Sequence, residues 1–359
     1  MYNEVGDTMI KRNQTKKVYI KDLQIGGQNK VIIQTMTLNK TANIEAVIKE
    51  INTYFTHGAM LVRLAILDEE DARAIKTIKA RTNVLLSADI HFDYRLALLA
   101  IENGIDKIRL NPGNIANKEH IKEVVTACKK HNIPIRIGIN AGSLEKDLLK
   151  TYGKTSLAMV ESAKRHIKIL EDLDFYNTII SLKASDIKLT IDAYLLASET
   201  FDYPLHIGIT ESGPLYQGLV ASSAGLGTLL YHGIGDTIRI SLSTNDRLDE
   251  LKACKTLLSS FNLYAMPKII ACPTCGRLSY DMQPILKKLE HYLETHDIPL
   301  TIAVMGCAVN GPGEAKDADI GIAGGKEEGL IFVKGKIKRK VKQDELYDAL
   351  IEEIKQYKN

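Results

Sequence analysis

Three cysteines in the C-terminal part of the chain are the residues best suited to metal or redox chemistry. Cys272 and Cys275 lie in ACPTCGR, and Cys307 follows in VMGCAVNGPGE. A structural zinc site normally closes with four Cys or His ligands, and no fourth cysteine lies nearby. Three thiolates suit a 4Fe-4S cluster whose remaining iron is held by another group. We expect that group to be Glu314 in NGPGE, because a carboxylate binds such iron more weakly than a thiolate and could yield to substrate.

Other interpretations of the cysteines remain open from their spacing alone. A CxxC pair is typical of zinc sites and of thioredoxin-type redox pairs as well as of clusters. The addition of Cys307, in a Gly-rich loop that carries a carboxylate, favours the cluster over zinc. Cys128 and Cys254 lie in the helical patterns KEVVTACKK and ELKACKT, where a small buried side chain is the better interpretation.

Composition and charge exclude several classes of protein. The chain has 359 residues, and its formal net charge of +3 is too small to indicate a nucleic-acid partner. No apolar run resembles a signal peptide or is long enough to span a bilayer, so we expect no membrane association and a cytoplasmic location. Cysteines in that compartment stay reduced, which favours ligands or redox centres over disulfides.

Short β-rich runs alternate with amphipathic helical patterns through Phe261. Eight runs predict strands: VIIQTMT from Val31, LVRLA from Leu61, LSADIH from Leu86, KIRLNP from Lys107, IRIGIN from Ile135, IISLKAS from Ile179, LHIGITE from Leu205 and TIRISLS from Thr237. Parallel neighbours need crossovers of about a dozen residues or more, which the intervening segments supply. The pattern therefore predicts a TIM-type (βα)8 barrel, with an inserted helical hairpin at GSLEKDLLKTYGKTS.

The regular alternation of strand and helix patterns ends after Phe261, which predicts a second, smaller domain. Strands are expected at IIACP and LTIAVMGC, then a Gly-rich loop and the hairpin LIFVKGKIKRKV, with helices from Asp281 to about His296 and over KQDELYDALIEEIKQY. We therefore expect a substrate-binding barrel over residues 1–264 and an α+β domain over residues 265–359 that carries the cysteines.

Charged residues alternate with apolar ones inside the predicted barrel strands. In IRIGIN, for example, Arg136, Gly138 and Asn140 share the face opposite the isoleucines. Internal ion pairs would explain any one such residue, but five converging cations would repel one another unless they bind an anion, for which phosphate is the natural candidate. The expected substrate-binding residues are Arg63, Asp89, His91, Arg109, Arg136, Asn140, Lys183, Arg239 and Ser241.

Glu211 closes the predicted strand LHIGITE and stands apart from the cations. A carboxylic acid beside bound phosphates and low-dielectric walls has a raised pKa and could donate a proton. Capping the helix that follows is the alternative role for this residue.

Several motifs together resemble those of one enzyme family. In chain order they are VIIQTMT, NPGNI, RIGINAGSLE, SLKASD, HIGITESG, GIGDTIRISL, ACPTCGR and VMGCAVNGPGEAKDADIGIAGG, spread over about residues 17–335. They resemble the bacterial two-domain form of 4-hydroxy-3-methylbut-2-enyl diphosphate synthase, of the methylerythritol phosphate route to isoprenoids. The resemblance implies an oxidoreductase that opens the ring of 2-C-methyl-D-erythritol 2,4-cyclodiphosphate and removes water, using two single electrons delivered through a 4Fe-4S cluster.

The same resemblance implies roles for individual residues. The cluster ligands would be Cys272, Cys275, Cys307 and Glu314. The diphosphate would be held by Arg63, Arg109, Arg136, Asn140, Lys183, Arg239 and Ser241. Thr210, Glu211 and Asn310 would stand near the reacting carbons, with Glu211 as the acid.

The resemblance also implies partners. A flavodoxin or ferredoxin would supply the electrons, and two chains would form a head-to-tail homodimer in which the cluster domain of one covers the barrel mouth of the other.

Two other classes of function stay open from the residues alone. One is a non-redox barrel enzyme, such as a phosphate-sugar lyase, with a structural zinc. The other is a binding or scaffold protein whose cysteines only brace the small domain.

Overall fold

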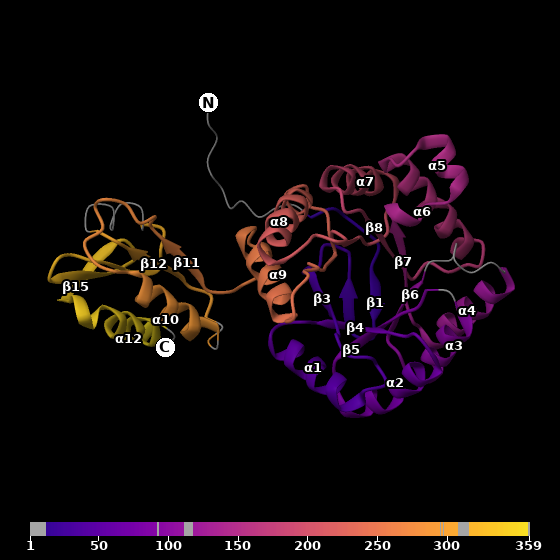
Figure 1. Cartoon of the computed structure of the whole chain (residues 1–359), viewed down its shortest axis with the longest axis horizontal. Coiled ribbons are helices and arrows are strands. Elements are labelled where there is room, and N and C mark those ends of the chain that lie inside the picture. The colour runs from indigo at the N-terminus through magenta and orange to yellow at the C-terminus, as the bar shows by residue number, and fades with distance from the viewer. Residues whose placement is uncertain are drawn as a thin grey trace. The chain divides into compact units, whose positions relative to one another are not determined.

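The computed structural model describes residues 12–91, 93–110, 118–294, 296, 298–307 and 316–357. The chain divides into two compact units, Met1–Tyr264 and Ala265–Asn359, which are described separately (Figure 1). Within the described residues, no helix combines the length and the apolar character needed to cross a bilayer.

The first unit is a barrel of eight parallel strands, which confirms the predicted fold class. The strands are β3 (Ile32–Met36), β4 (Leu61–Ala65), β5 (Leu85–Asp89), β6 (Lys107–Leu110), β7 (Ile135–Asn140), β8 (Thr178–Lys183), β9 (His206–Ile207) and β10 (Thr237–Ile238). Neighbours follow chain order, β10 pairs with β3, and a bridge between Ile180 and Leu205 closes the ring. The last two strands are shorter than their sequence runs, although Arg239 N–H still donates to Ile207 O at 3.1 Å.

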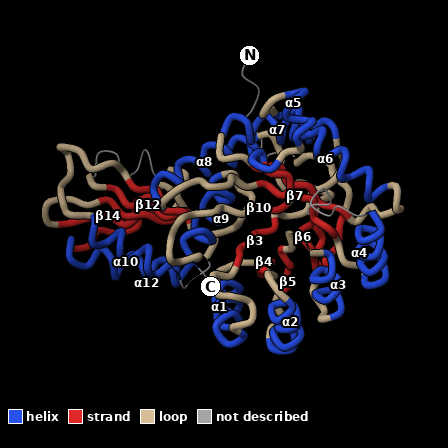
Figure 2. Tube along the Cα trace, turned by 45° about the vertical axis from the view of Figure 1, so that its right-hand side comes forward, coloured by secondary structure: helices blue, strands red, loops and turns tan. Residues whose placement is uncertain are grey.

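Helices cover the outside of the barrel, as Figure 2 shows. They are α1 (Ile44–Thr56), α2 (Glu69–Arg81), α3 (Tyr94–Glu102), α4 (Lys118–His131), α6 (Ser156–Glu171), α7 (Ile187–Thr200), α8 (Leu215–Tyr231) and α9 (Leu248–Ser260). Side-chain caps fix several starts: Asp68, Thr155 and Asp186 each accept a backbone N–H three residues on. The predicted insertion is also present, as η2 (Ala141–Ser143) and α5 (Lys146–Tyr152) before α6.

An apolar plug closes the amino-terminal end of the barrel. It consists of an antiparallel hairpin, β1 (Val18–Ile20) and β2 (Leu23–Ile25), that the sequence analysis did not predict. Its side chains form one buried cluster with inward-facing residues at the strand starts; the cluster comprises Val18, Ile20, Ile25, Ile32, Leu61 and Ile179. A buried ion pair between Arg12 and Asp236, 3.1 Å apart, holds the preceding segment in place. The hairpin therefore closes this end of the barrel with apolar side chains.

The second unit is a five-stranded sheet with two helices. Its elements are β11 (Lys268–Ala271), α10 (Gln283–Glu294), β12 (Thr301–Met305), β13 (Ile320–Ala323), β14 (Glu328–Val333), β15 (Lys336–Lys342), η3 (Gln343–Glu345) and α12 (Leu346–Tyr357). The first three strands are parallel and the last two antiparallel. Side chains of α10 and α12, including Leu289 and Leu350, pack on one face of the sheet.

Strand β13 lies in the segment that the sequence predicted to be a Gly-rich loop, so that prediction was wrong over Ile320–Ala323, whereas residues 308–315 of the loop lie outside the described residues. The physical reason is Gly321. A Cβ on this residue would come within 2.2 Å of the Phe332 ring on β14, so the glycine makes room for an aromatic side chain that covers the strand. Here glycine content reflects packing within the sheet rather than a turn.

Candidate functional site

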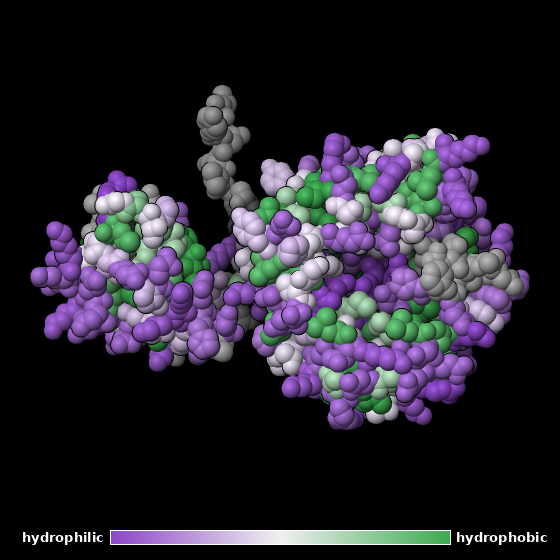
Figure 3. Space-filling view, viewed as in Figure 1, coloured by the Kyte–Doolittle hydropathy of each residue, from purple (hydrophilic) through white to green (hydrophobic). Residues whose placement is uncertain are grey.

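A cavity of about 270 Å³ opens at the carboxyl ends of the barrel strands. In Figure 3 the hollow in the middle of the barrel unit is lined by hydrophilic residues. Its lining consists of Arg63, Asp89, His91, Arg109, Arg136, Asn140, Ser181, Lys183, Ile209, Thr210, Arg239 and Ser241. The structure thus brings together all nine residues expected to bind substrate, and Thr210 with them; that they bind substrate stays a prediction.

Two glycines give the charged side chains room inside the barrel. A Cβ at Gly138 on β7 would lie 2.7 Å from Arg109 Nε, and one at Gly208 after β9 would lie 2.5 Å from Lys183 Nζ. Both distances are shorter than a van der Waals contact between carbon and nitrogen, so a side chain at either glycine would force the neighbouring cation to move. The strand pattern therefore combines long cationic side chains with glycines on the neighbouring strands.

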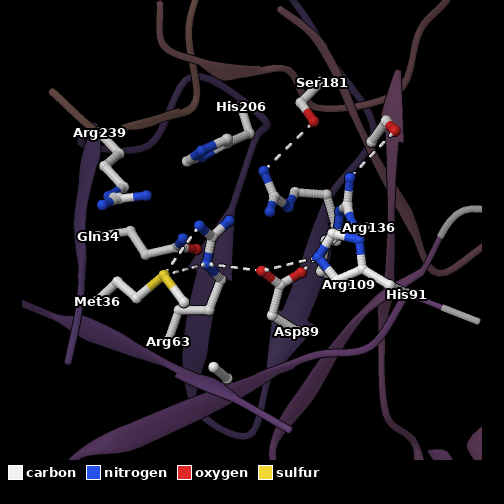
Figure 4. Close-up of polar contacts among 12 residues, drawn as sticks. Gln34, Met36, Arg63, Asp89, His91, Arg109, Arg136, Ser181, His206 and Arg239 are labelled. Atoms are coloured by element: carbon white, nitrogen blue, oxygen red, sulfur yellow. Dashed lines mark hydrogen bonds and ion pairs between the residues drawn. The ribbon is translucent and has the colours of Figure 1, made fainter. Parts of the chain in front are cut away.

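Asp89 is the acidic centre of the cavity (Figure 4). Its carboxylate lies 3.6 Å from Arg63 Nε, 3.4 Å from Arg109 Nη1 and 3.6 Å from His91 Nε2. Burial alone would raise the pKa of Asp89, but the charge of Arg63, the contact with His91 and the charges of the other arginines outweigh it and hold that pKa well below its usual range. Asp89 therefore stays ionised and compensates part of the positive charge.

Arg63 has weak partners inside the protein. Its Nε and Nη2 atoms lie 3.3 and 3.1 Å from the thioether sulfur of Met36, which is a poor acceptor. The distance to Asp89 is too long for a direct hydrogen bond. The guanidinium is thus positioned by packing while its donors stay available for a ligand.

Arg136 and Arg239 are buried and incompletely paired. Arg136 donates to Ser181 Oγ at 3.3 Å, whereas Arg239 Nη2 lies 3.7 Å from a Glu250 carboxylate oxygen. The Nε atoms of both arginines have no hydrogen-bond partner among the described residues. Burial lowers the pKa of Arg239 to about 10, aided by the charge of Arg63. Such groups favour a bound anion, which restores the interactions lost with water.

Several polar residues of the barrel that lie around the cavity-lining side chains were not found from the sequence. Lys107 is fully buried and donates to Gln34 Oε1 at 3.1 Å, and His206 contacts Lys183. The period-two rule that selected Arg109 could have found Lys107 and, on their own strands, Gln34 and His206. Glu250 lies on α9, and its carboxylate accepts a hydrogen bond from Leu242 N–H at 2.9 Å and contacts Arg247. The alternation of residues along a strand could not predict this helix residue.

Positive charge therefore dominates the barrel interior. The basic side chains are Arg63, Lys107, Arg109, Arg136, Lys183 and Arg239, and the carboxylates against them among the described residues are Asp89 and Glu250. Burial first, and then the neighbouring arginines, lower the pKa of Lys107 and of Lys183 far below the usual value. This crowding suits a polyvalent anion whose oxygens accept from several guanidinium groups.

Glu211 lies beside the cavity, immediately after Thr210. Its backbone has a positive φ of 55°, and its side chain is exposed. Ser212 Oγ donates to Ser241 O and joins this turn to the end of the neighbouring strand. Helix α8 begins only at Leu215, after Pro214, so Glu211 does not occupy its N-cap. Asn310, the other residue expected near the reacting carbons, lies outside the described residues.

The cysteines of the second unit follow two adjacent parallel strands. Cys272 comes directly after β11, and Cys307 comes two residues after β12. Cys272 Sγ accepts a hydrogen bond from Gly306 N–H at 3.0 Å, which places its sulfur beside the residue that precedes Cys307. Hydrogen bonds from the backbone and side chain of Arg277 lower the pKa of the exposed Cys275. The contact with Arg277 therefore favours the thiolate of Cys275 over its thiol.

The remaining ligands are less completely defined. Among the described residues, no three Cys, His, Asp or Glu side chains lie together as a metal site, and Glu314 lies outside the part of the chain that the structure describes. Cys128 and Cys254 are buried on barrel helices, and burial raises the pKa of each to about 12. They are the inert core side chains that the sequence predicted.

Comparison with known proteins identifies relatives over both units. Residues 15–255 match the GcpE TIM-barrel domain, and residues 268–356 match the GcpE protein C-terminal domain. The chain is 54% identical over 348 residues to a 4-hydroxy-3-methylbut-2-en-1-yl diphosphate synthase (flavodoxin) of Exiguobacterium sibiricum, covering 96% of this chain and 94% of that one. It is 55% identical over 345 residues to the protein of the same name from Macrococcus caseolyticus, covering 96% and 93%.

The solved structures show likeness in fold alone. The barrel is similar to dihydropteroate synthase of Yersinia pestis, with a TM-score of 0.51 and 13% identity over 68% of this chain and 98% of that one. The two domain matches and the relatives that are more than half identical over nearly the whole length are far more specific. The chain therefore belongs to the GcpE family.

Proposed function

We propose that this protein is a 4-hydroxy-3-methylbut-2-en-1-yl diphosphate synthase, the activity in the names of its relatives. Its substrate would be 2-C-methyl-D-erythritol 2,4-cyclodiphosphate. The reaction consumes two electrons and a proton, breaks a ring C–O bond and releases a hydroxyl group as water. The observation that supports this proposal best is the cavity whose basic side chains outnumber its carboxylates.

The cyclic diphosphate would bind among these basic groups. Arg63 and Arg136 have donors without strong protein acceptors, so phosphate oxygens would complete their hydrogen bonding. Asn140 and Ser241, at the cavity rim, would add neutral polar contacts. A bound diphosphate would also raise the lowered pKa values of the buried bases, because it adds negative charge beside them.

Glu211 would act as the general acid. It follows Thr210, which lines the cavity, and the contact of Ser212 with Ser241 O fixes its turn beside the segment that follows β10 and carries Arg239. A hydroxyl group leaves poorly as hydroxide, so protonation by a nearby carboxylic acid lowers the barrier. Asn310 would assist in the same region.

We propose a 4Fe-4S cluster held by Cys272, Cys275, Cys307 and Glu314. The donor set fits, since Cys272 accepts a backbone N–H and the pKa of Cys275 is lowered, and soft thiolates are the ligands that such clusters use. When bound, the cluster would pass single electrons to the substrate. A carboxylate at the fourth position would leave that corner exchangeable.

A reduced flavodoxin would supply the electrons, as the names of the relatives indicate for those proteins; a ferredoxin is the other carrier of this kind. The exposed edge strand β15 carries Lys336, Lys340 and Lys342, a charge that suits an acidic carrier. Both the carrier and a cluster of this kind belong in a reducing compartment, which supports the cytoplasm.

Two chains would form a homodimer, in which the cysteine-bearing unit of one would meet the barrel mouth of the other. The helix α8 supports such an interface, since it has no charged residue in LYQGLVASSAGLGTLLY. Its exposed side includes Leu215, Tyr216, Val220 and Tyr231. An uncharged surface of this kind is typical of association between subunits.

Metal analysis tests the cofactor. Protein purified under argon should contain about four iron and four sulfide ions per chain. Cys272→Ser should lose most of both, and Glu314→Ala should keep a cluster that air destroys faster, because a ligand is missing. Cys128→Ala, which removes a buried thiol from a barrel helix, is the matched control and should retain the full amount. Stoichiometric zinc without sulfide would contradict the cluster.

Anaerobic turnover of the cyclic diphosphate with reduced flavodoxin tests the reaction and the acid. Glu211→Gln should lower the rate roughly 100-fold or more, because the amide cannot donate the proton, while substrate binding persists. Glu199→Gln, at an exposed glutamate on α7, should leave the rate unchanged. Equal rates for wild type and Glu211→Gln would remove this residue from the mechanism. If the wild type forms no product with any reductant, the proposed reaction is wrong. If it is active with dithionite but not with reduced flavodoxin, the proposal that flavodoxin is the electron carrier is wrong.

Light scattering after size exclusion tests the dimer. The wild type should have twice the 39.8 kDa mass of the chain, and Val220→Glu should shift it toward a single chain because it places a charge in the uncharged face of α8. Phe55→Glu is the control, since Phe55 on α1 is 55% exposed and Val220 is 56% exposed. A wild type of single-chain mass would rule out the dimer, and equal masses for both variants would exclude α8 as the interface.

A further inference from the structure

His206 occupies a place in the barrel that the proposed mechanism does not use. It begins β9, is fully buried, and points into the space between Arg63, Arg136 and Arg239 (Figure 4). It is two residues before Gly208, the glycine that makes room for Lys183. A histidine among so many cations adds no favourable charge, so its position needs another explanation.

Both ring nitrogens of His206 have partners. Nε2 lies 3.2 Å from Lys183 Nζ, and Nδ1 lies 2.6 Å from the Thr237 hydroxyl. Lys183 must be an ammonium to bind an anion, and an ammonium only donates hydrogen bonds. Nε2 is then the acceptor, which places the ring proton on Nδ1, where it is donated to Thr237. With Lys183 in the ammonium form that a bound anion favours, the contacts therefore specify one neutral tautomer.

The electrostatic surroundings agree with a neutral ring. Burial, followed by the charges of Lys183, Arg136 and Lys107, lowers the pKa of His206 far below its ordinary value. A neutral acceptor suits this position better than a carboxylate would. It fixes the direction of the ammonium but leaves the positive charge of Lys183 available to an anion.

The surrounding backbone joins His206 to the strand of Lys183. Tyr194 on α7 donates its hydroxyl hydrogen to His206 O at 2.5 Å and accepts Leu182 N–H at 3.1 Å. One buried side chain therefore links β9 at His206 to β8 at the residue before Lys183. Gly208 lies against Lys183 Nζ on the same side, so the ammonium is confined between the imidazole and the glycine backbone.

We propose that His206, itself oriented by Thr237, is a positioning residue that holds the ammonium of Lys183 in the direction needed to bind the diphosphate. The inference rests on the proposed function, because it assumes an anion in the cavity. Lys183 keeps two further N–H groups for phosphate oxygens while the third is donated to Nε2. His206 itself does not touch the substrate and acts through Lys183.

A double-mutant cycle on anion binding tests this directly. Calorimetry would measure inorganic pyrophosphate binding to the wild type, His206→Phe, Lys183→Met and the double variant. His206→Phe should weaken binding about tenfold, in line with the loss of one charge-assisted hydrogen bond. The double variant should bind within about twofold of Lys183→Met, because His206 has nothing left to position. Independent, multiplying losses would overturn the inference.

Rescue variants separate positioning from a general structural role. The amide oxygen of His206→Gln can reach the place of Nε2 and should restore affinity to within about threefold, whereas His206→Asn reaches only the place of Nδ1 and should stay weak. Rescue by asparagine and not by glutamine would overturn the proposal. His166→Phe, at a buried histidine on α6 that pairs with Glu145, controls for the loss of a buried ring and should bind normally.

The same titrations keep this inference distinct from the proposed function. A folded wild type that does not bind pyrophosphate at all would contradict the anion site itself. Wild-type binding with independent losses in the cycle would contradict only the role of His206. Thermal unfolding of each variant, followed by circular dichroism, verifies that the proteins compared are folded.

Discussion

Repulsion among buried cations is the constraint on which the rest of this structure depends. A TIM-type barrel normally fills its interior with branched apolar side chains. Here the interior holds arginines and lysines, and Asp89 and Glu250 compensate them only in part. Burying charge in this way costs stability unless each group is paired and hydrogen-bonded. The arrangement is understandable if a polyanion completes it.

The fold supplies what this arrangement needs. Val18, Ile20 and Ile25 close the amino-terminal end of the barrel with apolar side chains, and the cavity opens at the other end. Gly138 and Gly208 leave space for Arg109 and Lys183. Weak or neutral partners, such as the Met36 thioether and the Ser181 hydroxyl, orient guanidinium groups without neutralising them. The interior is therefore preorganised for a ligand, at the expense of stability.

The sequence predicted the barrel from the alternation of strand and helix patterns. It predicted the binding residues from the alternation of polar and apolar residues within strands. These residues share one cavity because parallel strands place their carboxyl ends at the same edge of the sheet. The same rule also fits Lys107 and His206, which were overlooked. Glu250 could not be predicted, since a helix residue that folds back onto a strand end leaves no pattern in the sequence. The β1–β2 hairpin lies in a polar stretch with strands of three residues, and β13 was missed because Gly321, which packs under Phe332, suggested a loop.

The stability of the empty barrel tests the central claim most directly. Urea denaturation would compare the wild type with Arg136→Met, which replaces a buried guanidinium by an apolar side chain of similar length. If the cations are retained for a ligand, the variant should be as stable as the wild type or up to about 3 kcal/mol more stable, and pyrophosphate should stabilise the wild type more than the variant. A variant about 3 kcal/mol or more less stable than the wild type would show that Arg136 is needed for the fold, and would contradict the account.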